Sequence, residues 1–183
     1  MNKIGFPILI STIFFINGCD SVEPILPKTS GETTINTKLV DHKYNGFSFS
    51  QGETINYPNS NNINPDIIVL VQTNETGNIL GVFFGPGGNL RPTFNLIKQF
   101  NNTDSAQIFF DNLFEVPDSN YMDLALSVNV NQIWAVKTND VKFGKILILH
   151  TEAYVDNSNP SSPTLYGEAT FKWKYQPNGS RIF

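Results

Sequence analysis

The sequence predicts an all-β fold, an antiparallel, sandwich-like domain with one short helix, over residues 37–183. The chain contains 15 Phe, 6 Tyr and 2 Trp, and aromatic side chains are enriched in β-strands. Its 13 Gly and 11 Pro interrupt the chain often, so few segments are long enough to form a helix. Several of the remaining segments alternate apolar and polar residues, which is the period of a strand with one solvated face.

The first 18 residues have the composition of a secretory signal peptide. Lys3 precedes an apolar run over residues 4–16, which is shorter than the ~20 residues that a membrane-spanning helix needs. The run ends in Ile-Asn-Gly-Cys at residues 16–19, an order that resembles the lipobox of bacterial lipoproteins. We therefore predict that residues 1–18 are removed and that Cys19, the only cysteine, carries acyl chains such as palmitate. The alternative is an ordinary secretory leader followed by a buried free cysteine.

Residues 19–36 are expected to form the lipidated cysteine and a flexible tether, because two prolines, a glycine and many hydroxyl groups leave no hydrophobic period. The lipid predicts a membrane-anchored protein of the bacterial cell envelope, at the outer membrane, on its surface or on its periplasmic face. The formal net charge of −4 argues against nucleic-acid binding, which needs a basic surface. A lipidated Cys19 leaves no cysteine for a disulfide or a zinc site.

The first half of the domain is expected to contain a strand and a hairpin. Residues 47–50 alternate Phe and Ser, which indicates a half-buried strand, and the Asn-rich residues 57–65 follow as a loop. Residues 66–73 and 79–85 are apolar on both faces, as in the arms of a hairpin that is covered on both sides. The Gly-rich residues 85–89 predict a turn rather than a phosphate cradle, since no Gly-Lys-Ser/Thr follows.

The second half is expected to contain an edge strand, the helix and the most regular strands. Pro92 limits residues 90–100 to an edge strand or an irregular ribbon. Asp104 is expected to cap the helix, which ends before Pro117. The last segments alternate so that one face packs and the other meets water. The predicted strands are residues 132–138, 143–155, 165–175 and 180–183.

Six short motifs follow one another in a distinctive order over residues 45–183. The motifs are Phe-x-Phe running into Gln51-Gly52, Asp66-Ile67 opening an apolar strand, a Gly/Pro-rich loop, Trp134-Ala-Val-Lys-Thr, Phe143-Gly-Lys-Ile-Leu-Ile, and residues 171–175 running into Gln176-Pro-Asn-Gly-Ser. This order resembles the HmuY-like lipoproteins. The resemblance implies an all-β, lipid-anchored protein that binds haem between two side chains and delivers it to an outer-membrane receptor for iron acquisition.

The chain departs from the HmuY-like pattern at the residues that matter most for haem. Pro65 stands where the family often has Trp, and only two histidines are present. The candidate haem-iron ligands are therefore His150, Met122 and His42, since imidazole and thioether both ligate haem iron. The alternatives are a partly buried His150 hydrogen-bonded to a neighbour such as Glu152, a surface His42, and a Met122 that only fills space.

Other chemistry has weaker support in the sequence. Trp134, Trp173, Tyr154 and Tyr166 could form a stacking platform for sugars, although Trp173 lies on the apolar face of its strand and favours core packing. The chain has no Gly-x-Ser-x-Gly, no His-Glu-x-x-His and no cysteine nucleophile, so we expect no enzyme.

Two functional hypotheses follow. The first is an envelope lipoprotein that binds a small ligand, haem or a related tetrapyrrole, for uptake. The second is a β-sandwich module without that ligand, which serves adhesion, envelope structure or the capture of a glycan or protein. An apolar cavity with a polar residue at its mouth favours the first hypothesis, and a filled core with no pocket of ~300 Å³ or more favours the second.

Overall fold

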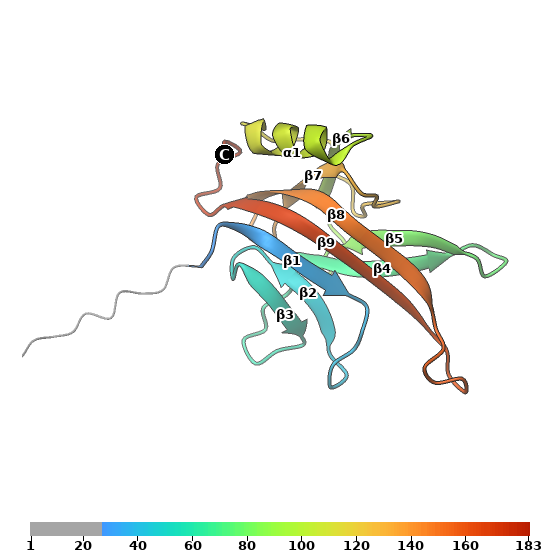
Figure 1. The fold of residues 1–183 in the computed structure, drawn as a ribbon. Coiled ribbons are helices and arrows are strands. Elements are labelled where there is room, and N and C mark those ends of the chain that lie inside the picture. Colours follow the sequence, from blue (N-terminus) through green and yellow to red (C-terminus); the bar gives the residue numbers. More distant parts are fainter. Residues whose placement is uncertain (1–26) are drawn as a thin grey trace, which may run out of the picture.

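The computed structural model describes residues 27–183, which form two antiparallel sheets and one short helix (Figure 1). The elements are β1 (Ser30–Asn36), β2 (Tyr44–Ser48), β3 (Glu53–Tyr57), β4 (Ile67–Thr73), β5 (Ile79–Gly85), β6 (Phe94–Gln99), α1 (Thr103–Asn112), β7 (Gln132–Lys137), β8 (Phe143–Asp156) and β9 (Thr164–Gln176). One sheet has the strand order β1-β9-β8-β7-β6 and the other has the order β3-β2-β4-β5. The all-β prediction with one short helix is confirmed.

The core lies between the two sheets and is rich in aromatic rings. The ring of Phe47 on β2 lies 4.9 Å from that of Trp173 and 5.6 Å from that of Phe171, both on β9. Trp173 is 2 % exposed and Trp134 on β7 is 1 % exposed. Both tryptophans are therefore core residues and neither offers a stacking surface to a sugar, in agreement with the alternation seen in the sequence.

A glycine on β8 allows the two sheets to approach closely. Gly144 is buried and faces Phe49, which follows β2 in the other sheet. A Cβ atom at position 144 would lie 2.5 Å from Cε1 of Phe49. Because real atoms do not approach so closely, the ring of Phe49 occupies the space that any larger residue would need.

The long strands β8 and β9 form one continuous antiparallel ladder (Figure 1). A bulge between Ile148 and His150 shifts the register, so that Ile148 pairs with Phe171 while His150 pairs with Thr170. Ile148 and Phe171 are buried in the core, whereas His150 is exposed. Beyond the bulge, β8 therefore presents His150, Glu152 and Tyr154 to solvent.

Helix α1 begins slightly earlier than the sequence suggested. The N-cap is Asn102, whose side chain accepts a hydrogen bond from the backbone N–H of Ser105 at 2.8 Å. The expected cap, Asp104, lies instead in the first turn, where a carboxylate still favours the positive end of the helix dipole. The prediction of the cap was wrong because Asn is as good an N-cap as Asp and stands two positions earlier.

Helix α1 covers the outer face of the five-stranded sheet, where it packs on β7 and β8. Phe110 is the largest helix residue buried there. Lys145 of β8 is buried beneath the helix, and its Nζ donates to the carbonyl oxygens of Phe110 and Leu113 at 2.8 and 2.6 Å. Burial lowers the pKa of Lys145 to about 8. Its ammonium group satisfies carbonyls at the end of the helix that attracts cations.

The segment of residues 122–128 connects the two sheets at one side. Ala125 pairs with Phe84 of β5, and Met122 pairs with Phe94 of β6. Strands β5 and β6 are the ends of their respective sheets, and β6 is therefore the edge strand that Pro92 predicted. The irregular segment supplies hydrogen bonds to both edges, which would otherwise carry unpaired backbone groups.

Three parts of the sequence prediction need correction. Residues 30–36 are not tether, because β1 pairs along its whole length with β9 and its Ile35 is fully buried. Residues 53–57 form β3, which pairs with β2 and was not expected. Residues 180–183 form no regular strand, since only Ile182 bridges to Glu115.

The signal peptide and Cys19 lie outside the described residues. The part of the tether before residue 27 lies outside them as well. Within residues 27–183, no helix combines the length and the apolar character that crossing a bilayer requires.

Candidate functional site

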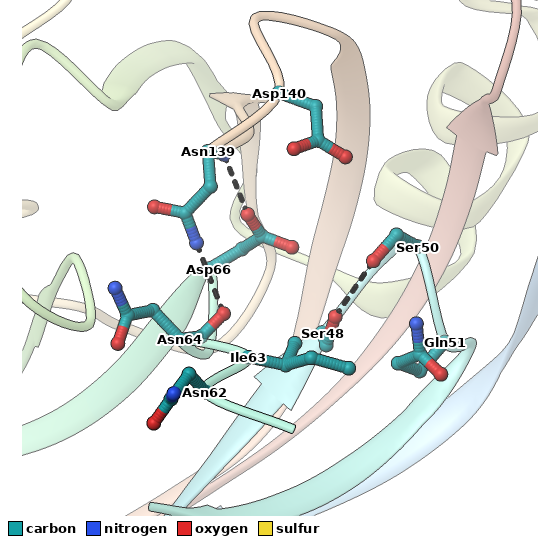
Figure 2. Close-up of a pocket in the computed structure, with 9 residues that line it drawn as sticks. All are labelled: Ser48, Ser50, Gln51, Asn62, Ile63, Asn64, Asp66, Asn139 and Asp140. Carbon is teal, nitrogen blue, oxygen red and sulfur yellow. Dashed lines mark hydrogen bonds between the residues drawn. The ribbon is translucent and has the colours of Figure 1, made fainter. Parts of the chain in front are cut away.

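A polar pocket of about 480 Å³ opens where three connections meet beside the sandwich. These connections are the β2–β3 turn, the β3–β4 loop and the β7–β8 turn, which come from both sheets. Loops on a rigid β-scaffold commonly carry binding sites. The lining residues, shown in Figure 2, are Ser48, Ser50, Gln51, Asn62, Ile63, Asn64, Asp66, Asn139 and Asp140.

The side chain of Asp66 ties these connections together. Its Oδ1 accepts a hydrogen bond from the backbone N–H of Asn139 at 2.7 Å, and its Oδ2 accepts one from the N–H of Phe49 at 2.9 Å (Figure 2 shows the first). Asp66 is 3 % exposed, and burial raises its pKa to about 6. The nearest described cation, Arg91, lies 3.9 Å from Oδ1. Asp66 therefore carries a negative charge at neutral pH, and both of its carboxylate oxygens already accept a backbone hydrogen bond.

Asparagine side chains hold the β3–β4 loop in place. The Nδ2 of Asn139 donates to the backbone oxygen of Asn64 at 3.0 Å (Figure 2). Within the loop, Asn59 accepts a hydrogen bond from the N–H of Ile63 at 3.0 Å and donates to its carbonyl oxygen at 2.8 Å. Such side-chain bonds to nearby backbone are what Asn supplies in irregular segments. The Asn side chains thus hold the β3–β4 loop in one conformation, and this loop forms one side of the pocket.

The β7–β8 turn beside the pocket has a strained backbone. Val141 has a φ of +59°, a conformation that a β-branched residue adopts only at a cost. The turn is held by the N–H of Thr138, which donates to the oxygen of Lys142 at 2.9 Å, and by the N–H of Val141, which donates to Thr138 at 3.1 Å. This geometry places Asn139 and Asp140 at the pocket.

The chemistry of the lining favours a polar ligand without negative charge. Ser48 and Ser50 share a hydrogen bond of 3.1 Å, and their hydroxyl groups can turn to donate or accept (Figure 2). Asp140 is exposed and forms no ion pair with any residue of the described range 27–183. The lining contains no Lys, Arg or aromatic residue, and Ile63 is its one apolar side chain.

A second, mainly apolar hollow of about 210 Å³ shares Ser50 with the polar pocket. Tyr175 lines this hollow and is 6 % exposed, and its hydroxyl has no hydrogen-bond partner among residues 27–183. Burial raises the pKa of Tyr175 to about 12, and the charges of Asp66 and Asp140 add to the effect. A buried hydroxyl without a partner is costly, so this side of the site has an unused polar group.

The structure places the three candidate iron ligands on separate elements. His150 lies on the outer face of β8 and is exposed, so the alternative of a partly buried, hydrogen-bonded histidine does not hold. Met122 is 46 % exposed and lies in the segment that bridges β5 and β6. His42 is exposed in the turn between β1 and β2, with a φ of +62°.

The described residues fit haem poorly. A tetrapyrrole needs an apolar cavity beneath its iron ligand. The large pocket is polar, and two mainly apolar hollows of residues 27–183 measure only about 210 and 200 Å³. His150, Met122 and His42 line neither of these hollows.

The surroundings of His150 are acidic. One ligand atom each of His150, Glu152 and Glu168 lies within 4.8 Å of the other two. Glu152 faces Glu168 across the ladder, and the rings of Tyr154 and Tyr166 lie 4.9 Å apart on the next rung.

Comparison of the chain with family models, with curated proteins and with solved structures gave no match. The resemblance to HmuY-like lipoproteins therefore stays a prediction from the order of motifs.

Sequence reasoning did not identify the residues of the polar pocket. The available signals were the Asn-rich loop bracketed by prolines and an Asp at the start of an apolar strand. Taken alone, the first signal predicts a loop and the second the start of a hairpin strand, and neither points to a binding site.

Proposed function

We propose that this protein is a lipid-anchored binding protein of the bacterial envelope that captures a small, polar, neutral or cationic ligand without transforming it. The observation that carries the proposal is the pocket of about 480 Å³, lined by hydroxyl, amide and carboxylate groups with no basic residue. Pockets of this size hold small molecules, and a few placed polar groups give them specificity.

The charge of the pocket selects among polar ligands. Asp66, whose raised pKa is only about 6, and Asp140 leave the lining with a net negative charge at neutral pH even after Arg91, 3.9 Å from Oδ1 of Asp66, offsets one of them. An anionic ligand would be repelled and would find no Lys or Arg in the lining. A ligand with hydroxyl groups and an amine can donate to the free carboxylate of Asp140 and exchange hydrogen bonds with Ser48 and Ser50.

The proposed N-terminal lipid would place the pocket near a membrane surface. A diacylated Cys19 would hold the domain at the membrane surface, since two or more chains give stable anchoring. The tether before β1 then separates the domain from the bilayer. Binding without catalysis suits a protein that collects a solute for a membrane partner, for which an outer-membrane receptor is the proposed candidate.

Calorimetric titration with three sugars of graded charge tests the proposal. We expect D-glucosamine to bind more tightly than D-glucose, and D-glucuronate not to bind. Asp140→Asn should weaken glucosamine about tenfold, because a hydrogen bond to a charged group contributes roughly 1.5–3 kcal/mol, and should leave glucose nearly unchanged. Glu75→Gln, in the exposed β4–β5 turn, is the matched control and should change nothing. Tightest binding of glucuronate, or equal effects of both variants, would show that the pocket is not the site.

Haem is the second candidate ligand, favoured by the motif order and by the exposed imidazole of His150. Titration with haemin separates the two candidates. A polar-ligand protein leaves the spectrum of free haemin unchanged, whereas a haem-binding protein shifts and sharpens the Soret band at one-to-one stoichiometry. In the second case, replacing His150 or Met122 by Ala should alter that band.

A further inference from the structure

The β8–β9 ladder brings three metal-binding side chains together on its outer face. His150, Glu152 and Glu168 each offer a ligand atom, and these atoms lie within 4.8 Å of one another. Glu152 pairs directly with Glu168, and His150 lies two residues from Glu152 on the same face. The bulge before His150 brings its imidazole to this face, where β-bulges often redirect a side chain.

The carboxylates of Glu152 and Glu168 face each other across the ladder, with no Lys or Arg of residues 27–183 paired to either. Like charges directly opposite on neighbouring strands destabilise a sheet. No Lys or Arg of residues 27–183 lies within ion-pair distance of Glu152 or Glu168. The nearest lysine along β9, Lys172, instead donates to Gln107 of α1 at 2.6 Å. A bound cation would therefore relieve a repulsion that no Lys or Arg of residues 27–183 offsets.

The second carboxylate has a neighbour that fixes its orientation. The hydroxyl of Tyr166 donates to Oε2 of Glu168 at 2.6 Å. Oε1 of Glu168 has no hydrogen-bond partner among residues 27–183 and is free to ligate. Partners of this kind orient metal-binding carboxylates and imidazoles in known sites.

We propose that His150, Glu152 and Glu168 bind one divalent transition-metal ion of the Zn²⁺ type. One imidazole nitrogen and two carboxylate oxygens suit Zn²⁺, whereas Ca²⁺ and Mg²⁺ prefer oxygen ligands alone. Tetrahedral bonds of ~2.0–2.1 Å place ligand atoms roughly 3.3 Å apart, a distance that small rotations of exposed side chains can reach. Three protein ligands leave the fourth position to water. The site lies on other elements than the polar pocket and does not depend on the proposed function.

Titration of the full-length protein with ZnCl₂ in a buffer that does not chelate metals tests this site. We expect one zinc per chain and a rise in the melting temperature with zinc. His150→Ala, Glu152→Gln and Glu168→Gln should each lower zinc affinity at least tenfold. Tyr166→Phe should lower zinc affinity about tenfold while leaving the melting temperature without zinc unchanged, as expected of a positioning residue.

His42→Asn is the matched control, because it removes the other histidine and Asn tolerates the positive φ at that position. It should leave zinc binding intact, and CaCl₂ should not bind the wild type at the same site. The proposal is overturned if the wild type takes up no zinc at millimolar concentration, or if binding survives His150→Ala. Equal losses in His150→Ala and His42→Asn would overturn it too.

Discussion

Replacing Asp66 by Asn tests the electrostatics of the polar pocket through folding stability. Burial raises the pKa of Asp66 from 3.8 to about 6 in the folded protein. Between these pH values the folded protein holds a proton that the unfolded chain has already lost, so stability falls as the pH rises. At about 1.4 kcal/mol per pH unit, the free energy of unfolding that depends on Asp66 should fall by about 2–2.5 kcal/mol between pH 4 and pH 7, because the unfolded carboxyl is already more than half ionised at pH 4. Asn does not titrate and should show no such fall.

Urea unfolding followed by fluorescence of the two buried tryptophans measures this effect at each pH. The quantity of interest is the wild-type free energy of unfolding minus that of Asp66→Asn, because the other titrating groups are common to both proteins. We expect this difference to decrease by about 2–2.5 kcal/mol from pH 4 to pH 7 and to be level above pH 7. A difference that is constant or rises with pH would mean that the N–H groups of Phe49 and Asn139 outweigh burial, and the raised pKa would be wrong.

Three further substitutions test the fold around the site by urea unfolding. Gly144→Ala should destabilise the protein by about 1–3 kcal/mol, because the added Cβ would lie 2.5 Å from Cε1 of Phe49; an unchanged midpoint would contradict that packing. Asn102→Ala should lower the free energy of unfolding by about 1 kcal/mol, since the N–H of Ser105 loses its acceptor. Asn102→Asp, which keeps an acceptor at the N-cap, should have nearly the wild-type stability. Val141→Gly should stabilise the protein by about 1 kcal/mol, because it relieves the strain of a φ of +59°, and a destabilised variant would argue against the strained turn.

The regular strands could be predicted from sequence because their burial alternates. Residues 165–175 place Phe171 and Trp173 on one face and lysines on the other, and the structure buries the first set. Strand β1 carried no such signal, since Ser, Gly, Glu and Thr fill five of its seven positions. It forms because β9 offers an edge to pair with and because Ile35 completes the core.

The pocket could not be predicted from any local pattern. The hydrogen bond from Asn139 to Asp66 joins residues 73 positions apart, and that from Phe49 joins residues 17 apart. Their proximity follows from the pairing of β2 with β4 and from the stacking of the two sheets, which sequence period does not encode.

His150 shows how one irregularity changes the interpretation of a residue. The apolar run before it predicted the end of a buried strand. The bulge adds a residue to β8 and turns the imidazole outwards to the two glutamates. A bulge of this kind has no dependable sequence signature, so the grouping of His150 with Glu152 and Glu168 required the structure.

Chemical-shift mapping with ¹⁵N-labelled protein and D-glucosamine tests most directly whether the polar pocket binds a ligand. Saturable shifts are expected at the amide signals of Ser50, Asn64 and Asn139, with none at Glu75 in the distant β4–β5 turn. The absence of shifts with all three sugars, or shifts confined to the outer face of β8 and β9, would contradict a binding site at the pocket.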